Sequence, residues 1–526
     1  MPDHRVHPAS YRDPSGFVFQ SGSLYYRQVN KSYAQGYEEL LRSGLYETLT
    51  RRELLLPHTE IGENLTGSPE WYKTLLPRQI PFISYPSEWS PAQLKDAALL
   101  TLKILSIATD HGMILKDATP FNIQFIGGKP VFIDTLSFEK YDATLPWVAY
   151  RQFCECMLFP LYLQHYLSTG THWILSAWPE GIPAGVTAGM LPLKSRLRLG
   201  VWLHVLLQSR IQQTHSSKDT QAGRGRPEDG GPLDKGWPDG RRPEDRRHLS
   251  DGERSVDRRT AFSKEKLMHL VNNLESIVSR MKTDDGKLSV WNNYYESTIS
   301  SQSYLEAKEK LFRGFIGGLE FGSALDLGAN DGYFSRILAQ ALAEKAEALA
   351  PKAGAPTEKK EGVLAQAVIA VDSDWRCIQR LYDLTRLQPS FPIVPLVIDL
   401  ANPTPASGFH HAERASFSGR ARCDLVIALA LIHHLALARN IPLTKIAAFL
   451  ADLTGEYLIA EFVALSDEKS QELIRAKSQW QKGYDESGFE AALAPYFAIE
   501  RKETISGSVR ILYLLKRRGG EAEGRK

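Results

Sequence analysis

Hydrophobic residues in the C-terminal half of the chain form short continuous runs that alternate with helically spaced stripes. The runs start at Ser323 and have the length and β-branched composition of buried parallel strands. A helical stripe precedes them, formed by Leu267, Val271, Leu274, Val278 and Met281. This alternation predicts an α/β fold with a Rossmann-like, doubly wound and mostly parallel sheet within residues 262–526.

Five runs and a final pair are expected to form the strands of this sheet. The five runs are SALDL, AVIAVD, IVPLVIDL, CDLVIALAL and YLIAEFV. The final segment, FAIERKETISGSVRILYLLKR, predicts an antiparallel hairpin with a Gly-Ser turn. Two inserts, Lys345–Gly362 and Asn402–Ala421, are expected as surface loops.

The composition changes sharply between the two halves of the chain. Residues 1–212 are rich in aromatic and apolar runs and are expected to fold. Residues 213–261 are dominated by Gly, Pro, Arg and Asp, which predicts a disordered, charged linker. An arginine-rich segment of this kind could contact RNA, but its acids interleave with its bases, which favours a solvated spacer.

Charge and cysteine content exclude several classes of protein. The 526 residues carry a net charge of +2, so no global electrostatic attraction to nucleic acid or anionic membrane is expected. Four scattered cysteines give neither a disulfide framework nor a zinc site. The first residues lack the apolar core of a secretory signal, so we expect a cytoplasmic protein without membrane insertion. The oligomeric state is not readable from the sequence.

The turn after the first strand contains candidate cofactor-binding residues. It comprises Asp326, Gly328, Asn330 and Gly332. Its glycines would let the backbone approach a ligand closely, and the following helix N-terminus would favour an anionic group. Asp326 could pair with a ligand's ammonium group. Many tight turns share this pattern, so the turn alone is weak support for a nucleotide site.

Acids at the ends of the next two strands strengthen that hypothesis. Asp372 ends the second strand, where a carboxylate can hydrogen-bond ribose hydroxyls. Asp399 ends the third, where it could accept from an adenine amino group. Either acid alone fits any Rossmann-like fold, and Asp399 could simply cap a helix. A nicotinamide dehydrogenase is disfavoured, since such enzymes more often show three glycines and lack the final hairpin.

This order of motifs resembles the class I, seven-strand S-adenosylmethionine-dependent methyltransferases, over roughly Ser289 to Arg518. The resemblance implies that the glycine turn is the family's first motif, with Asn330 in place of a usual glycine. It also implies that Asp372 binds the ribose and that Asp399 with Leu400 flanks the adenine of S-adenosylmethionine. The segment Trp291–Ser297 resembles the part that covers the cofactor in some members.

Methyl transfer is expected beside the end of the fourth strand. His433 and His434 follow that strand, and a histidine suits the deprotonation of a hydroxyl. One of them could instead cap the helix or pack in the core. Glu461, at the end of the fifth strand, is a second candidate for binding the acceptor. We expect no metal ligands in this region.

The N-terminal half carries a separate pattern. Asp117, Asn122 and Asp134 have the order and spacing of the base and two metal ligands in protein kinases, with Gly127-Gly128 as a hairpin turn between them. Residues 1–212 therefore resemble a kinase-like α+β domain. There is no Gly-rich phosphate loop, and the early strand SGSLYYRQVN offers only Arg27. A degenerate module that binds substrate or a partner is favoured over an enzyme using ATP and magnesium.

The whole arrangement, with ALALIHHL in its second half, resembles the NoeA-like bacterial methyltransferases. That resemblance implies a small or carbohydrate-like methyl acceptor. Two alternatives stay open from the residues. One is a bifunctional protein with phosphotransfer in the N-terminal half, and the other is a non-catalytic scaffold.

Overall fold

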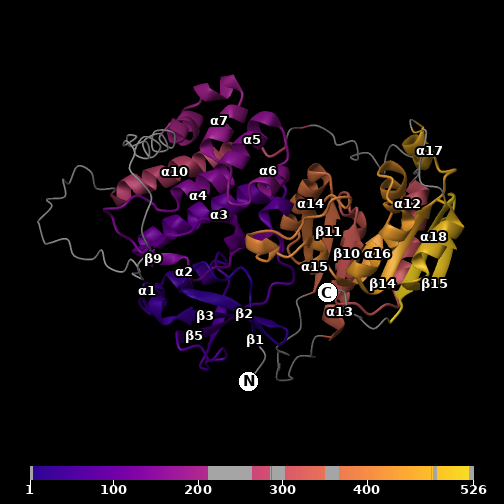
Figure 1. Ribbon diagram of the computed structural model, residues 1–526, viewed down its shortest axis with the longest axis horizontal. Helices are drawn as coiled ribbons and strands as arrows, with labels where there is room; N and C mark the ends of the chain where they lie inside the picture. The colour runs from indigo at the N-terminus through magenta and orange to yellow at the C-terminus, as the bar shows by residue number, and fades with distance from the viewer. Residues whose placement is uncertain are drawn as a thin grey trace, which may run out of the picture.

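A computed structural model describes residues 4–210, 263–284, 286, 302–349, 366–475, 477 and 483–519 (Figure 1). The expected linker at 213–261, the segment Trp291–Ser297 and most of the insert Lys345–Gly362 lie outside these residues. Within the described ranges, no helix combines the length and apolarity needed to cross a membrane.

The C-terminal domain is built on one seven-stranded sheet. Its strands are β10 (Ser323–Leu327), β11 (Ala367–Asp372), β12 (Ile393–Val397), β13 (Cys423–Ala428), β14 (Thr454–Val463), β15 (Phe497–Thr504) and β16 (Arg510–Arg517). They lie in the order β12-β11-β10-β13-β14-β16-β15. Neighbours from β12 to β14 pair in parallel, and β16 is antiparallel to both β14 and β15. The predicted parallel strands and the final hairpin are therefore confirmed.

Helices cover both faces of this sheet. They are α12 (Gln302–Ile316), α13 (Tyr333–Leu349), α14 (Trp375–Leu387), α15 (Phe417–Arg420), α16 (Leu443–Leu453), α17 (Glu468–Ile474) and α18 (Glu486–Leu493). Side chains alternate along each strand, so Leu325 and Leu327 enter one apolar core while Ala324 enters the other, against α12 and α13. The strand order reverses between β10 and β13. In open α/β sheets such a switch point leaves a crevice at the carboxyl ends of the strands.

The N-terminal domain is α+β. A five-stranded antiparallel sheet has the order β1-β2-β3-β5-β4, with β1 (His4–Val6), β2 (Gly16–Ser21), β3 (Leu24–Asn30), β4 (His58–Ile61) and β5 (Trp71–Pro77). Two smaller antiparallel pairs follow, β6 (Met113–Leu115) with β9 (Phe138–Lys140) and the hairpin of β7 (Ile123–Ile126) with β8 (Lys129–Phe132). The expected hairpin with a turn at Gly127-Gly128 is confirmed.

The rest of this domain is helical. Its α-helices are α1 (Ala34–Arg42), α2 (Leu45–Arg51), α3 (Pro91–Asp110), α4 (Tyr150–Phe153), α5 (Phe159–Leu167), α6 (His172–Ala177), α7 (Ala184–Met190) and α8 (Leu199–Val201). The long helix α3 begins with a capping box, in which the Ser90 hydroxyl accepts from the Gln93 amide and the Gln93 side chain accepts from the Ser90 amide. Helix α10 (Lys264–Arg280) opens the second folded region in sequence, but its apolar stripe packs against α3.

Helix α3 also joins the two domains, as its position beside α14 shows (Figure 1). The amide of Ala92 donates to Gln379 Oε1 at 3.1 Å, and Gln93 Nε2 donates to the carbonyl of Pro395 in β12 at 3.2 Å. The Tyr382 hydroxyl donates to Asp96 at 2.7 Å. These polar groups are buried or partly buried, so the domains meet through a fixed interface.

The insert Asn402–Ala421 was expected as a surface loop, but part of it is docked on the N-terminal domain. The Arg420 guanidinium forms an ion pair with Glu88, which is 0% exposed, and lies 4.1 Å from the ring centroid of Tyr85. The Arg414 guanidinium lies 3.9 Å from the ring centroid of Phe121. Arginine stacks well on aromatic faces, which explains why a charged loop packs there instead of extending into solvent.

Replacing Arg420 tests whether this ion pair holds the domains together. Arg420→Ala leaves the fully buried Glu88 carboxylate without its cation, so we expect the free energy of unfolding to fall by about 3 kcal/mol or more. Denaturant unfolding measures this loss. Lys129→Ala, which removes the exposed pair with Glu53, is the matched control and should change stability by less than about 1 kcal/mol. Equal losses in both variants would contradict the assignment.

Candidate functional site

The turn after β10 has the backbone that its glycines predicted. Gly328, Asn330 and Gly332 all have positive φ, at 79°, 51° and 80°. A side chain at Gly332 would begin 2.4 Å from Leu381 Cδ1, so only glycine fits beside α14. The Gly328 amide donates to the carbonyl of Val371 at 2.9 Å. The turn is therefore held against the end of β11.

Asp372 ties that turn to the start of the next helix. One carboxylate oxygen accepts from the Asn330 amide at 2.9 Å, and the other accepts from the Asp374 amide at 2.8 Å. Burial raises the pKa of Asp372, while these amide hydrogen bonds oppose the rise. The structure thus brings the glycine turn and the second-strand acid together, as the sequence predicted.

Asp326 lies beneath the turn and is 3% exposed. The Ser335 hydroxyl, from α13, donates to it at 2.6 Å. Burial raises the pKa of Asp326 to about 7, and the nearby charge of Asp372 adds to that rise. Asp326 therefore changes its charge near neutral pH.

Asp399 and Leu400 follow the edge strand β12. The Asp399 carboxylate is 44% exposed, accepts from the Ala401 amide at 2.9 Å and lies 3.5 Å from the Arg439 guanidinium. The amide of Ile398 donates to the carbonyl of Asp372 at 2.8 Å, which places the ends of β11 and β12 side by side. The three predicted acids thus lie at or near the carboxyl ends of three adjacent strands.

The histidine pair begins a short helical turn beyond β13. His433 is fully buried, and neither of its ring nitrogens has a hydrogen-bond partner within the described residues. Burial holds the pKa of His433 well below its usual value and lowers that of His434 to about 4. Both rings are therefore neutral near pH 7. A neutral imidazole can accept a proton, as the predicted base must.

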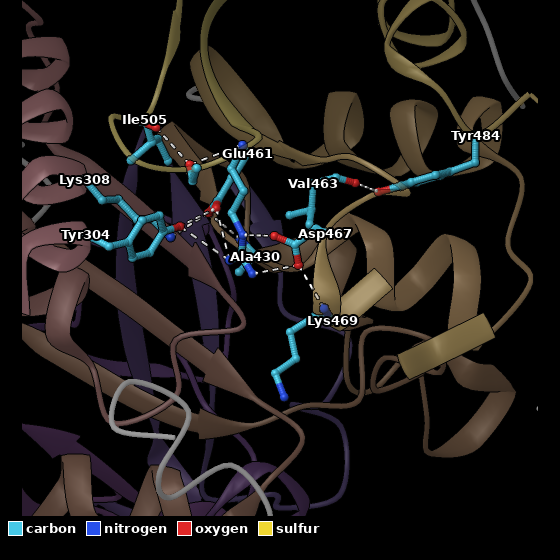
Figure 2. Close-up of polar contacts among 11 residues, drawn as sticks. Tyr304, Lys308, Ala430, Glu461, Val463, Asp467, Lys469, Tyr484 and Ile505 are labelled. Carbon is cyan, nitrogen blue, oxygen red and sulfur yellow. Dashed lines mark hydrogen bonds and ion pairs between the residues drawn. The ribbon is translucent and has the colours of Figure 1, made fainter. Parts of the chain in front are cut away.

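Glu461 lies at the centre of a buried polar network, shown in Figure 2. Its carboxylate, 0% exposed, accepts from Lys308 Nζ at 2.5 Å, from the Ala430 amide at 2.9 Å and from the Tyr304 hydroxyl at 3.2 Å. Arg510 Nη1 lies 3.5 Å away. The sequence suggested that Glu461 binds the acceptor, but its carboxylate is bonded to protein groups on every side. This geometry favours a role in positioning the turn at Ala430, whose amide Glu461 binds.

Sequence reasoning missed the cations of this network. Arg510 forms a two-pronged ion pair with Asp467, at 2.8 and 3.1 Å, and Lys308 is 3% exposed. One signal was available in the sequence. Lys308 falls four residues from both Tyr304 and Phe312, on the apolar stripe of a helix whose other charges face outward. A lysine at such a position indicates a buried anion nearby.

The N-terminal acids also come together. Asn122 Nδ2 donates to Asp117 at 3.3 Å and to Ser137 Oγ at 3.2 Å, and the Ser137 hydroxyl donates to Asp134 at 2.7 Å. Arg27 from β3 forms an ion pair with Asp134 at 2.8 Å. The described residues contain no cluster of three His, Cys, Asp or Glu side chains arranged to hold a metal. A cation of the protein itself therefore neutralises Asp134.

Comparison with known proteins places this chain near one curated relative. It is 28% identical to nodulation protein NoeA of Rhizobium meliloti (strain 1021) over 512 residues, which cover 97% of this chain and 95% of that protein. No family model matches the sequence. The alignment with NoeA thus extends across both domains.

Several solved methyltransferases match about 40% of the chain. A SAM-dependent methyltransferase from Aquifex aeolicus is 16% identical, with 41% of this chain and 93% of that chain covered and a TM-score of 0.27. The 16S rRNA methylase RmtB is 16% identical, with 41% and 64% covered and a TM-score of 0.25. WbdD, solved with a kinase inhibitor, is 18% identical, with 40% and 39% covered and a TM-score of 0.23. The strand order itself defines the fold of the C-terminal domain.

The raised pKa of Asp326 predicts a pH-dependent stability. A carboxylate whose folded pKa is about 7 and whose ordinary value is 3.8 stabilises the folded state below about pH 4, and this contribution is lost as pH rises through 7. Asp326→Asn cannot ionise, so its stability relative to wild type should increase between about pH 4 and 7, by up to about 4 kcal/mol, and stay constant above that. Urea unfolding across that pH range measures the difference. A constant difference would show that Asp326 does not titrate there.

Proposed function

We propose that this chain is an S-adenosylmethionine-dependent methyltransferase whose active site lies at the switch point of the C-terminal sheet. The observation that carries the proposal is Asp372, whose carboxylate is bonded to the Asn330 amide of the glycine turn and to the start of α14. When bound, the cofactor supplies an electrophilic methyl group. The residues around the crevice have only to hold it, align the acceptor and remove a proton.

Each part of the cofactor has a matching group in the proposal. Asp372 accepts hydrogen bonds from the ribose hydroxyls, and Asp326 in its ionised form pairs with the methionine ammonium. The turn at Gly328 and Gly332 presents its backbone to the cofactor, because both glycines adopt the positive φ that the turn requires. Asp399 and Leu400 flank the adenine, at the edge of the sheet where the sequence predicted it.

His433 is the proposed base for the acceptor. Its ring is neutral because burial lowers its pKa, and both ring nitrogens are free to accept or donate within the described structure. A buried polar group without a partner costs about 1–3 kcal/mol, which a hydroxyl or amine of the acceptor would recover on binding. Glu461 holds the Ala430 amide in the turn that leads to His433, and this fixes the approach of the ring.

The acceptor is proposed to be a small or carbohydrate-like molecule. Support comes from the NoeA-like motif order and from the nearly neutral net charge, which gives no general attraction to nucleic acid. ATP-dependent phosphotransfer by the N-terminal domain is the weaker candidate, because Arg27 neutralises the carboxylate that a magnesium ion would need. A pure scaffold is disfavoured by the buried acids at the switch point, since burying a carboxylate is costly without a use.

Removing Asp372 tests the cofactor site. Isothermal titration of the full-length chain with S-adenosylhomocysteine should show binding that Asp372→Ala weakens by about 100-fold, the value of two hydrogen bonds to a charged group. Asp383→Ala, on the outer part of α14, serves as the control and should bind like wild type. Absence of binding by the wild-type chain would overturn the proposed function.

Replacing His433 tests the base. With labelled S-adenosylmethionine and a cell extract as the source of acceptor, His433→Ala should lower methyl incorporation by about 10²–10⁴-fold, the usual contribution of a general base. Affinity for S-adenosylhomocysteine should stay within about twofold. His269→Ala removes an exposed histidine on α10 and should leave both measurements unchanged. Undiminished incorporation by His433→Ala would assign the base to another residue.

A further inference from the structure

A small apolar cluster lies where the nucleoside end of the cofactor is proposed to bind. Trp375 starts α14, three residues after Asp372, and Val397 ends β12, two residues before Asp399. These two side chains form with Ile378 a cluster separate from the main cores of the molecule. Trp375 is 7% exposed although it stands at the tip of a helix. Something outside the C-terminal sheet must therefore cover it.

That cover comes from the N-terminal domain. A side chain on Gly170 would begin 2.9 Å from Trp375 Cδ1 and 2.5 Å from His172 Nδ1, so the segment before α6 touches the indole directly. Helix α6 in turn packs on the turn Pro86–Glu88, which contacts β12. The position of α6 beside α14 is visible in Figure 1. The ends of β11 and β12, which carry the proposed cofactor-binding residues Asp372 and Asp399, thus lie beside α6 and the segment before it.

Two polar side chains of this segment each have one buried atom without a hydrogen-bond partner in the described part of the chain. Thr171 is 0% exposed, and neither its Oγ1 nor His172 Nδ1 has a hydrogen-bond partner within the described residues. Each such group costs about 1–3 kcal/mol. Burial also lowers the pKa of His172, so its ring is neutral and can accept as well as donate. An adenine edge, which carries both donors and acceptors, would satisfy these atoms.

The domain interface keeps this segment at a fixed distance from the sheet. Gln93 bonds to the backbone of β12, and the Ala92 amide bonds to Gln379 one turn along α14 from Trp375. Both glutamine side chains are nearly fully buried. These buried bonds hold the segment before α6 beside the start of α14.

We propose that the N-terminal domain forms one wall of the nucleoside end of the cofactor pocket, with His172 and Thr171 as hydrogen-bonding groups toward the adenine. This inference rests on the proposed function. It gives the N-terminal domain a role in cofactor binding that does not depend on its Asp117 cluster. It also makes the cofactor site a property of the full chain and not of the seven-strand sheet alone.

Two ligands that differ only at the amino-acid end can distinguish a contact to the adenine from contacts elsewhere in the pocket. S-adenosylhomocysteine and 5′-methylthioadenosine share the nucleoside, but the second lacks the amino-acid group. Titrated into the full-length chain, His172→Ala and the nearly isosteric Thr171→Val should each weaken both ligands by the same factor, about 5- to 50-fold. Asp326→Asn should weaken only S-adenosylhomocysteine. Ser176→Ala, exposed on the same helix, is the matched control.

The possible outcomes separate the two proposals. If wild type binds both ligands and neither His172→Ala nor Thr171→Val changes their affinities, the N-terminal wall is wrong while the proposed function stands. If the two variants weaken S-adenosylhomocysteine but not 5′-methylthioadenosine, the contact is to the amino-acid end and the assignment to adenine is overturned. If wild type binds neither ligand, both proposals fail. Thermal unfolding of each ligand-free variant, expected within a few degrees of wild type, excludes loss of fold as the cause.

Discussion

Every carboxylate buried at the carboxyl ends of the central strands needs a donor, and this requirement organises the site. A buried charge without hydrogen bonds would cost more than the domain could sustain. The carboxylate of Asp372 accepts hydrogen bonds from two backbone amides, and that of Asp326 accepts one from a serine hydroxyl. The carboxylate of Glu461 accepts from a lysine ammonium group, a backbone amide and a tyrosine hydroxyl. These donors come from the glycine turn, the loop before α14, the loop after β13, and helices α12 and α13. Satisfying the acids therefore fixes the loops around the crevice.

The fold of the C-terminal domain was predictable because its signals are local. A continuous apolar run such as AVIAVD specifies a buried strand through its own residues, and the Gly-Ser turn specifies the hairpin that follows. The acids at strand ends were predictable for the same reason, since parallel strands present their carboxyl ends at one edge. The glycine turn was predictable from its own residues, and the structure gives Gly328 and Gly332 the positive φ that glycine permits.

The features that sequence reasoning missed all depend on contacts between distant segments. Glu88 and Arg420 are separated by more than three hundred residues, and nothing near either one marks it as a member of a buried pair. Lys308 and Glu461 are 153 residues apart and also form a buried pair, although the lysine on an apolar stripe was a usable sign. The docking of Asn402–Ala421 was missed because a polar composition predicts exposure, and stacking of arginine on aromatic rings reverses that expectation.

Glu461 shows how one buried network can serve both stability and chemistry. Its bond to the Ala430 amide holds a non-glycine residue at φ 50°, a conformation that costs free energy and persists only where neighbouring contacts impose it. That residue lies three positions before His433, so the direction of the backbone into the histidine pair depends on the position of Glu461. Lys308 and Arg510 keep Glu461 ionised, because both cations lower its pKa against the effect of burial. The same two cations lie close enough to His433 to disfavour its protonated form. The network therefore maintains an anion that shapes the turn, and its cations favour the neutral form of the His433 ring.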